Sequence, residues 1–298
     1  MSDAITVRVP AKVNVQLAVG AARPDGFHDL ANVFLAVSLH DEVTATPAAG
    51  LTVTCAGPDA DKVPLDRTNL AARAAELLAG RAGIAPGVHL HIEKRIPVAG
   101  GMAGGSADGA AALLACDALW GLKTPAEDLL ALCAELGSDV PFSLVGGAAL
   151  GVGRGEILTP VAAGTFHWVF AVADGGLSTP AVFREFDRLT AGTEVPVPQA
   201  SPALLAALAS GDPDALAATL ANGLQPAALS LRPSLADTLA AGVGAGALAA
   251  LVSGSGPTTA FLVRDAESAA KVAAALAASG TCRSTHLATS PAPGATVL

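Results

Sequence analysis

Apolar and polar residues alternate along the first part of the chain, and this period of two predicts a β-rich opening. Residues 5–9 read Ile-Thr-Val-Arg-Val, and residues 13–19 hold a second run of this kind. Successive side chains of a strand point to opposite faces, so alternation is typical of a strand with one buried face. Further strands are expected at residues 33–37, 42–46 and 51–55, and the Pro-Asp-Gly run at 24–26 predicts a turn.

Helix start and stop signals dominate the stretch that follows. The Thr-Asn pair at 68–69 opens a helix that is expected to reach about residue 81 and to stop at Gly83. Thr124-Pro125-Ala126-Glu127 has the form of a capping box and predicts a helix that ends near residue 136. Other elements expected here are a strand at 88–93, a helix at about 106–120, a tight connection at 137–141 and β structure at 148–152.

The second half of the chain mixes strands and helices without a regular βαβ alternation. Asp212-Pro213 predicts a capped helix, and residues 191–200 form a polar, proline-containing loop. Strands are expected at 167–172, 248–252, 259–263 and 283–288, helices at 179–189 and 265–279, and a glycine-rich loop at 242–246. This mixture predicts an α+β protein, with a division near residue 160.

Composition narrows the functional classes. The chain has 298 residues, of which 52% are hydrophobic and 14% charged, so it can bury a large core. A net charge of −9 with only 17 Lys plus Arg disfavours a dedicated nucleic-acid binder. The absence of a secretory pattern at the start, and of any apolar run of about 20 residues, predicts neither export nor membrane insertion.

The four cysteines carry a separate indication about the compartment. Cys55, Cys116, Cys133 and Cys282 are widely spaced, and no CxxC pair occurs. Zinc and thioredoxin-like sites use closely spaced cysteine pairs, so neither is expected. Scattered cysteines are typical of buried thiols in a reduced cytoplasm, which is the predicted location.

A glycine-rich segment at residues 97–108, Pro-Val-Ala-Gly-Gly-Met-Ala-Gly-Gly-Ser-Ala-Asp, is the strongest chemical signal. Glycine has no Cβ, so its backbone N–H groups can converge on an anion, and the helix expected next adds positive partial charge. The segment lacks the lysine of a Walker A loop, and its spacing differs from that of the dinucleotide fingerprint. A flexible connector remains the non-functional alternative.

The same segment resembles the central ATP-binding motif of the GHMP kinases, a family that includes galactokinase, homoserine kinase and mevalonate kinase. The family's first motif resembles Pro10-Ala11-Lys12-Val13-Asn14, and its last resembles Ser253-Gly254-Ser255-Gly256-Pro257. The resemblance implies an N-terminal ribosomal-protein-S5-like nucleotide domain, residues 1–160, and a C-terminal ferredoxin-like substrate domain, residues 161–298. It also implies ATP as the phosphate donor and Mg²⁺, whose ligands stay unassigned.

Three further segments resemble family members that phosphorylate a cytidine diphosphate sugar alcohol. These segments are residues 23–30, 137–142 and 178–183. The chain departs from the usual pattern at Phe27, where tyrosine is common, and at Met102, Ala103 and Ala107. The implied reaction is phosphorylation of a hydroxyl of that alcohol in the cytoplasm of a bacterium, by a monomer or homodimer. Another small alcohol, such as homoserine or mevalonate, is the alternative.

The resemblance assigns the transfer chemistry to Lys12 and Asp139. Asp139 is expected to accept the hydroxyl proton as transfer proceeds, or to act as an orienting charge, and both readings stay open. Lys12 would keep that carboxylate ionised and favour an alkoxide-like oxygen. A solvated strand lysine and a turn aspartate are the structural alternatives. Asn14 lies two residues from Lys12, on the same side of a strand, and would bind substrate or orient Asp139.

Substrate and ATP contacts follow from the same resemblance. Phe27 and Phe183 would stack on the pyrimidine, His28 would face its edge and Thr179 belongs to the second substrate segment; core packing is the alternative for the aromatics. ATP is expected to contact Pro97, Gly100, Gly101, Gly104, Gly105, Ser106, Gly254, Ser255 and Gly256, with Asn69 and Lys94 on the adenine side. His89 and His91 have a metal-like spacing, but surface or core positions are favoured because no acidic or cysteine partners cluster nearby.

Overall fold

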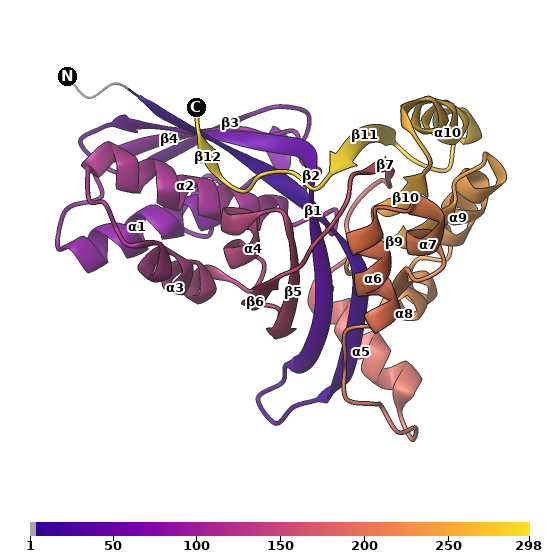
Figure 1. The fold of residues 1–298 in the computed structure, drawn as a ribbon. Helices are drawn as coiled ribbons and strands as arrows, with labels where there is room; N and C mark the ends of the chain where they lie inside the picture. Colours follow the sequence, from indigo (N-terminus) through magenta and orange to yellow (C-terminus); the bar gives the residue numbers. More distant parts are fainter. Residues whose placement is uncertain (1–3) are drawn as a thin grey trace.

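The computed structural model describes residues 4–298, which form two sheets with helices packed on them (Figure 1). The larger sheet has eight strands, and its main path runs β12-β1-β2-β4-β3. Its strands are β1 (Ile5–Ala22), β2 (His28–Pro47), β3 (Thr52–Ala56), β4 (Val88–Glu93), β5 (Ala148–Gly153), β6 (Ile157–Pro160), β8 (Ala221–Asn222) and β12 (Thr296–Val297). β5 pairs with β2 and β6, and β8 pairs with β1.

The two longest strands, β1 and β2, form an antiparallel pair at the centre of the larger sheet. The expectation of two separate strands at 5–9 and 13–19 was wrong, since both belong to β1, and β2 likewise merges the strands expected at 33–37 and 42–46. Register shifts occur at Pro10/Ala11 and between Asn14 and Gln16. A bulge bends a strand without ending it, which lets one long strand accommodate a proline that cannot donate to the ladder.

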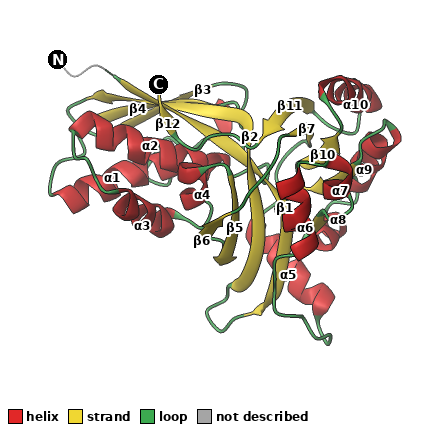
Figure 2. Ribbon diagram, in the orientation of Figure 1, coloured by secondary structure: helices red, strands yellow, loops and turns green. Residues whose placement is uncertain are grey.

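Four helices, α1 (Leu70–Ala82), α2 (Gly104–Trp120), α3 (Ala126–Leu136) and α4 (Val140–Val145), lie on one side of this pair (Figure 2). The predicted caps of α1 are confirmed, because the Asn69 side chain accepts from Ala71 N and Gly83 takes φ +68°. The capping box at α3 was wrong, because Pro125 occupies the N-cap and no side chain caps it. The tight connection expected at 137–141 instead leads into α4.

The second sheet is antiparallel, with strand order β11-β7-β10-β9. It comprises β7 (Phe166–Val172), β9 (Ala249–Val252), β10 (Thr259–Val263) and β11 (Ser284–Ser290), with helices α5 (Thr179–Thr190), α6 (Pro202–Ser210), α7 (Pro213–Ala217), α8 (Gln225–Leu231), α9 (Leu235–Gly244) and α10 (Ala266–Ser279). Numbered by their own sequence order, the strands lie 4-1-3-2, with helices after the first and third, which is the ferredoxin-like arrangement.

The glycine-rich loop expected at 242–246 was wrong in part, because Gly242 and Gly244 end helix α9. A Cβ on Gly242 would lie 2.2 Å from the ring of Phe261, so this glycine lets the helix pack closely on β10. Gly242 therefore serves the packing of α9 on β10, which is one strand of the strand–turn–strand unit that follows. That unit, predicted at 248–252 and 259–263, is confirmed as β9 and β10.

The two parts of the chain are interleaved in the larger sheet. β8 and β12 both come from beyond residue 160, yet both pair with β1. The C-terminal strand therefore returns to the sheet in which the chain begins (Figure 1). The division between residues 160 and 161 stays a prediction. Within residues 4–298, no helix has the length and apolar character needed to cross a membrane.

Candidate active site

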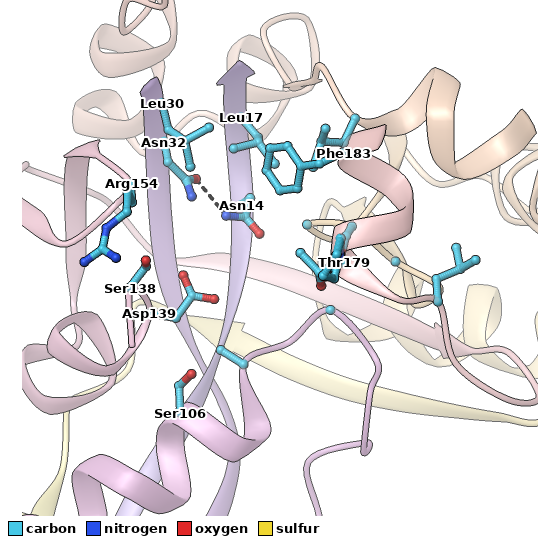
Figure 3. A pocket seen from close by; sticks show the side chains of 18 of the residues that line it. Asn14, Leu17, Leu30, Asn32, Ser106, Ser138, Asp139, Arg154, Thr179 and Phe183 are labelled. Atoms are coloured by element: carbon cyan, nitrogen blue, oxygen red, sulfur yellow. Dashed lines mark hydrogen bonds between the residues drawn. The ribbon is translucent and has the colours of Figure 1, made fainter. Parts of the chain in front are cut away.

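A cavity of about 700 Å³ opens between the helix-covered part of the large sheet and α5 (Figure 3). Most of the residues singled out in the sequence line it, although they come from widely separated segments. The predicted residues on its wall are Lys12, Asn14, Phe27, His28, Gly100, Gly101, Gly104, Gly105, Ser106, Asp139, Thr179, Phe183, Gly254, Ser255 and Gly256. The tertiary structure therefore gathers the three glycine- and lysine-containing motifs at one cavity.

Backbone hydrogen bonds join these three motifs directly. Lys12 N donates to the carbonyl of Met102 across 3.3 Å, and Thr258 N donates to the carbonyl of Gly100 across 3.2 Å. The Ser253 hydroxyl donates to the carbonyl of Gly101 at 3.2 Å. The segment of residues 97–105, called the glycine loop here, comprises the end of the β4–α2 connection and the first two residues of α2. It is therefore fixed between β1 and the turn at 253–258.

Two glycines are required by the closeness of these loops. Gly101 takes φ +76°, and a Cβ there would lie 2.2 Å from the carbonyl oxygen of Ser253. Gly254 takes φ +56°, and its Cβ would lie 3.2 Å from both Lys12 Nζ and Asn14 Oδ1. A side chain at either position would be strained and would separate loops that now touch. The glycines thus allow β1, the glycine loop and the 253–258 turn to share one wall.

The N-terminus of α2 supplies the anion-binding feature of the cavity. Gly104 and Gly105 begin the helix and Ser106 follows in the first turn, where backbone N–H groups have no helical carbonyl to bind. The nearest atom to a Cβ on Gly105 is 3.9 Å away, so this position is sterically open. Free N–H groups and the positive end of the helix dipole together favour a phosphate.

Lys12 and Asp139 meet across the cavity. Lys12 Nζ lies 3.6 Å from Asp139 Oδ2, and 7% of the lysine side chain is exposed against 32% for the aspartate. Lys12 also donates to Asn14 Oδ1 at 2.6 Å. A buried ammonium held by two oxygens has a fixed position, whereas the partly exposed carboxylate can reach a ligand in the cavity.

The opposite end of the cavity is aromatic. His28 is buried, its Nε2 lies 2.8 Å from Asp187 Oδ1, and its ring centroid is 4.9 Å from that of Phe183. Phe27 is 49% exposed at the rim, and the Arg154 guanidinium lies 5.2 Å from its ring centroid. A flat ring of a ligand could stack here, with a polar edge toward His28.

Hydrogen bonds from α5 and β8 hold the far side of the cavity. Thr179 Oγ1 and Ser255 Oγ are 2.8 Å apart, which ties the start of α5 to the 253–258 turn. Asn222 Nδ2 donates to the carbonyls of both Val252 and Gly254 at 2.7 Å. Asn222 belongs to a two-residue strand, and nothing in the local sequence marks it as a support of the turn.

Three residues expected to bind ATP, Asn69, Lys94 and Pro97, are not among those that line this cavity. Asn69 caps α1, and its Nδ2 donates to the carbonyl of Pro64. Lys94 Nζ is buried at 2.6 Å from both Asp41 Oδ2 and Asp108 Oδ2. Both side chains are thus engaged inside the protein, and their contact with the adenine side of ATP stays a prediction.

The buried group around Lys94 has unusual electrostatics. One ammonium serves two carboxylates, and burial raises the pKa of the Asp108 carboxyl despite the nearby lysine. The two carboxylates in turn raise the pKa of Lys94. A Cβ on Gly104 would lie 3.0 Å from Lys94 Nζ, so this buried charge lies directly beneath the first turn of α2.

Several residues of the cavity were missed by the sequence reasoning. They are Asn32, Ser138, Arg154, Arg184 and Asp187. Ser138, Arg184 and Asp187 lie within four residues of Asp139 or Phe183. Their closeness in sequence to these predicted site residues could therefore have identified them. Asn32 and Arg154 lie on β2 and just beyond β5, and their placement depends on strand pairing. His89 contacts Thr52 and Thr54, and residues 4–298 contain no group of three His, Cys, Asp or Glu suited to a metal.

Two family comparisons match the two halves of the chain. Residues 69–147 match "GHMP kinases N terminal domain", and residues 204–282 match "GHMP kinases C terminal". A 4-diphosphocytidyl-2-C-methyl-D-erythritol kinase of Streptomyces avermitilis is 75% identical over 99% of both chains. The corresponding protein of Thermobifida fusca is 61% identical and covers 99% of this chain and 98% of its own.

Solved structures resemble the fold over nearly its whole length. A 4-(cytidine 5'-diphospho)-2C-methyl-D-erythritol kinase shares 35% identity at a TM-score of 0.77, covering 96% of this chain and 99% of its own. A homoserine kinase from Cytophaga hutchinsonii has a TM-score of 0.75 at 22% identity, covering 100% and 98%. The second likeness, at this low identity, concerns the fold alone.

Proposed function

This chain belongs to the GHMP kinase family, and we propose on that premise that it transfers the γ-phosphate of ATP to the 2-hydroxyl of 4-diphosphocytidyl-2-C-methyl-D-erythritol. The names of relatives up to 75% identical over the full chain support this substrate over homoserine or mevalonate. The observation that carries the chemistry is the 3.6 Å approach of Lys12 Nζ to Asp139 Oδ2 in a cavity that also holds the glycine loop.

In the proposed reaction the 2-hydroxyl of the substrate lies beside Asp139. The carboxylate accepts the hydroxyl proton as the oxygen attacks phosphorus, and ADP leaves with the electrons of the broken P–O bond. The Lys12 ammonium stabilises negative charge on the attacking oxygen and on the transferred phosphoryl group. Asn14, which accepts a hydrogen bond from Lys12, keeps the ammonium directed into the cavity.

ATP would bind with its phosphates at the start of α2. Backbone N–H groups from Gly104, Gly105 and Ser106 and the helix dipole would neutralise part of the phosphate charge. Mg²⁺ prefers oxygen ligands and keeps several waters, and it supplies charge neutralisation to the transferred phosphate. The Ser106 hydroxyl and the Asp139 carboxylate are oxygen donors on the cavity wall, so they fit such an ion.

The cytidine would occupy the aromatic end. Phe183 and Phe27 offer ring faces, and His28 is oriented by Asp187 toward the pyrimidine edge. The diphosphate would lie between this end and Lys12, where Arg154 and Arg184 are further cationic residues of the wall. The proposal includes these assignments and the division at residue 160. It also includes a cytoplasmic location, which the four free cysteines support. A monomer and a homodimer are both compatible with it.

A coupled ADP-release assay on a panel of alcohols tests the proposal. We expect turnover with 4-diphosphocytidyl-2-C-methyl-D-erythritol and Mg·ATP, and none with homoserine or mevalonate. Phosphorylation at the 2-position is checked by ³¹P and ¹H NMR of the product. Turnover of homoserine or mevalonate, with none of the cytidine substrate, would overturn the substrate assignment while leaving the kinase chemistry in place.

A further inference from the structure

A hydrogen-bonded chain of side chains runs from Lys12 to a residue outside the known motifs. Lys12 Nζ donates to Asn14 Oδ1 at 2.6 Å, and Asn14 Nδ2 donates to Asn32 Oδ1 at 2.7 Å. All three side chains are buried, with residue exposures of 5%, 1% and 4% respectively. Figure 3 shows the amides of Asn14 and Asn32 facing each other across the β1–β2 pair.

The orientation of both amides follows from the chemistry of the lysine. An ammonium can only donate hydrogen bonds, so Asn14 must turn its oxygen to Lys12 and its nitrogen to Asn32. Asn32 must then present its oxygen to Asn14, because two amide nitrogens cannot bond each other. The remaining group of Asn32, its Nδ2, is left with two N–H donors.

The Asn32 nitrogen faces the cavity. No acceptor within residues 4–298 takes a hydrogen bond from it, although Asn32 lines the cavity wall. The buried side-chain polar atoms that lack a partner in this part of the chain are Asp108 Oδ1 and Thr258 Oγ1. The Asn32 nitrogen is therefore open to the cavity. It does not carry the cost of a buried donor without an acceptor, and it can donate to a ligand bound there.

The position of Asn32 along β2 defines what it would meet. His28, Leu30 and Asn32 alternate along the strand and all line the cavity, so Asn32 lies between the aromatic end and Lys12. The register shift between Asn14 and Gln16 sets Asn32 opposite Leu17, diagonal to Asn14. A ligand that reaches from the aromatic end to Lys12 must pass this side chain.

We propose that Asn32 is a specificity and positioning residue, whose Nδ2 donates to a substrate oxygen between the pyrimidine and the reacting hydroxyl and whose Oδ1 orients Asn14 and thereby Lys12. The inference rests on the proposed function, because it assumes a substrate that spans the cavity. A hydroxyl or phosphate oxygen fits the donor, and a carbon chain at this position would leave the donor unpaired.

Two variants separate the two roles. Asn32→Asp keeps an oxygen for Asn14 but removes the donor, so we expect KM for the cytidine substrate to rise about tenfold or more while kcat stays within about threefold. Asn32→Ala removes both contacts, so we expect the same rise in KM and a fall in kcat of about tenfold. KM for ATP should stay within about twofold in both variants.

The readouts distinguish every outcome. If KM rises in Asn32→Asp but not in Asn32→Ala, the cause is repulsion by the new charge, and the proposed contact of Asn32 Nδ2 with the substrate is wrong. If kcat is equal in the two variants, Asn32 does not position Asn14 and Lys12. Asn32→Ser, neutral and short, replaces Asn32→Ala if that variant fails to give a parental melting transition, with the same expectations. If Asn32→Asp fails in this way, Asn32→Ala and Asn32→Ser provide the test, and a kcat equal to that of the parent in both overturns the positioning role. Inactivity of the parent protein on the cytidine substrate refutes the proposed function itself, whereas an active parent with unaffected variants refutes this inference alone.

Discussion

The Ser253 hydroxyl donates a hydrogen bond of 3.2 Å to the carbonyl of Gly101, across 152 residues of sequence. This contact fastens the turn at 253–258 to the glycine loop at the start of α2. Because Lys12 N also donates to the carbonyl of Met102, β1, the glycine loop and the turn at 253–258 form one unit. Damage to the contact should therefore be felt both in stability and in ATP binding.

Replacing Gly101 tests this close approach. Gly101→Ala places a Cβ 2.2 Å from the carbonyl oxygen of Ser253 at a φ of +76°, so we expect a loss of about 1–3 kcal/mol of unfolding free energy. Gly105→Ala is the matched comparison, because its Cβ has no neighbour nearer than 3.9 Å. Gly105→Ala should leave the free energy of unfolding unchanged and raise KM for ATP, because its methyl group would lie where phosphate is proposed to bind. Urea titration and ATP kinetics check both, and equal stability losses would contradict the assignment.

Asp139 and Lys12 are predicted to act in transfer and not in ATP binding. Asp139→Asn should lower kcat by about 10²–10⁴-fold and leave the dissociation constant for ATP within about threefold. Lys12→Met should have a similar effect on kcat because the developing charge loses its ammonium. Asp128→Asn, the same change at an exposed position of α3, is the matched control and should be neutral. Full activity of Asp139→Asn would remove this residue from the mechanism.

The aromatic end should affect one substrate only. Phe183→Leu keeps an apolar side chain but loses the ring face, and base stacking contributes about 1–3 kcal/mol. We expect KM for the cytidine substrate to rise by about five- to 150-fold, with KM for ATP unchanged. Steady-state kinetics with each substrate varied in turn gives the comparison. A parallel rise in both KM values would indicate that Phe183 supports the fold of the cavity instead of the pyrimidine.

Asp108 should make stability depend on pH. Burial raises its pKa in the folded state above the value near 3.9 of an unfolded chain, so the folded protein holds a proton that the unfolded chain releases. The resulting stability is present at low pH and declines as pH rises from about 4 through the raised pKa of the folded state. Asp108→Asn, which is neutral throughout, should flatten this decline.

The test of Asp108 is a set of urea titrations of both proteins at several pH values between 5 and 9. The pH dependence that remains in Asp108→Asn measures all other groups. Asp59 adds none of it in this range, because Arg283 lowers its pKa and the carboxyl is ionised in both the folded and the unfolded state above pH 5. Parallel stability curves for the two proteins across this range would show that Asp108 is charged when folded, contrary to the expectation.

Sequence patterns identified most of the cavity wall because its motifs are local. Glycine spacing marks the loop, and the helix that follows it makes a phosphate site intelligible without tertiary knowledge. The same reasoning did not reveal that Lys94 is enclosed by Asp41 and Asp108, which lie 53 and 14 residues away. No local pattern shows whether a lysine faces a cavity or is enclosed by carboxylates brought in by other elements.

Arg154 and Asn32 were missed for a related reason. Neither lies in a recognisable motif, and each reaches the cavity only because β5 and β1 pair with β2 in a particular register. A shift of one residue would turn Asn32 to the other face of the sheet. The register shift between Asn14 and Gln16 is therefore part of the site, although the alternation of residues 13–19 gives no sign of it.

By itself the sequence determined the α+β mixture, the caps of α1, the glycine loop and the order of the three motifs, because each depends on residues close together in the chain. Only the tertiary structure decided that Lys12 meets Asp139, that Asn14 joins it to Asn32, and that Lys94 is buried. The physical reason is that hydrogen bonds and ion pairs act over a few ångströms, and strand register and helix packing select which distant side chains come that close.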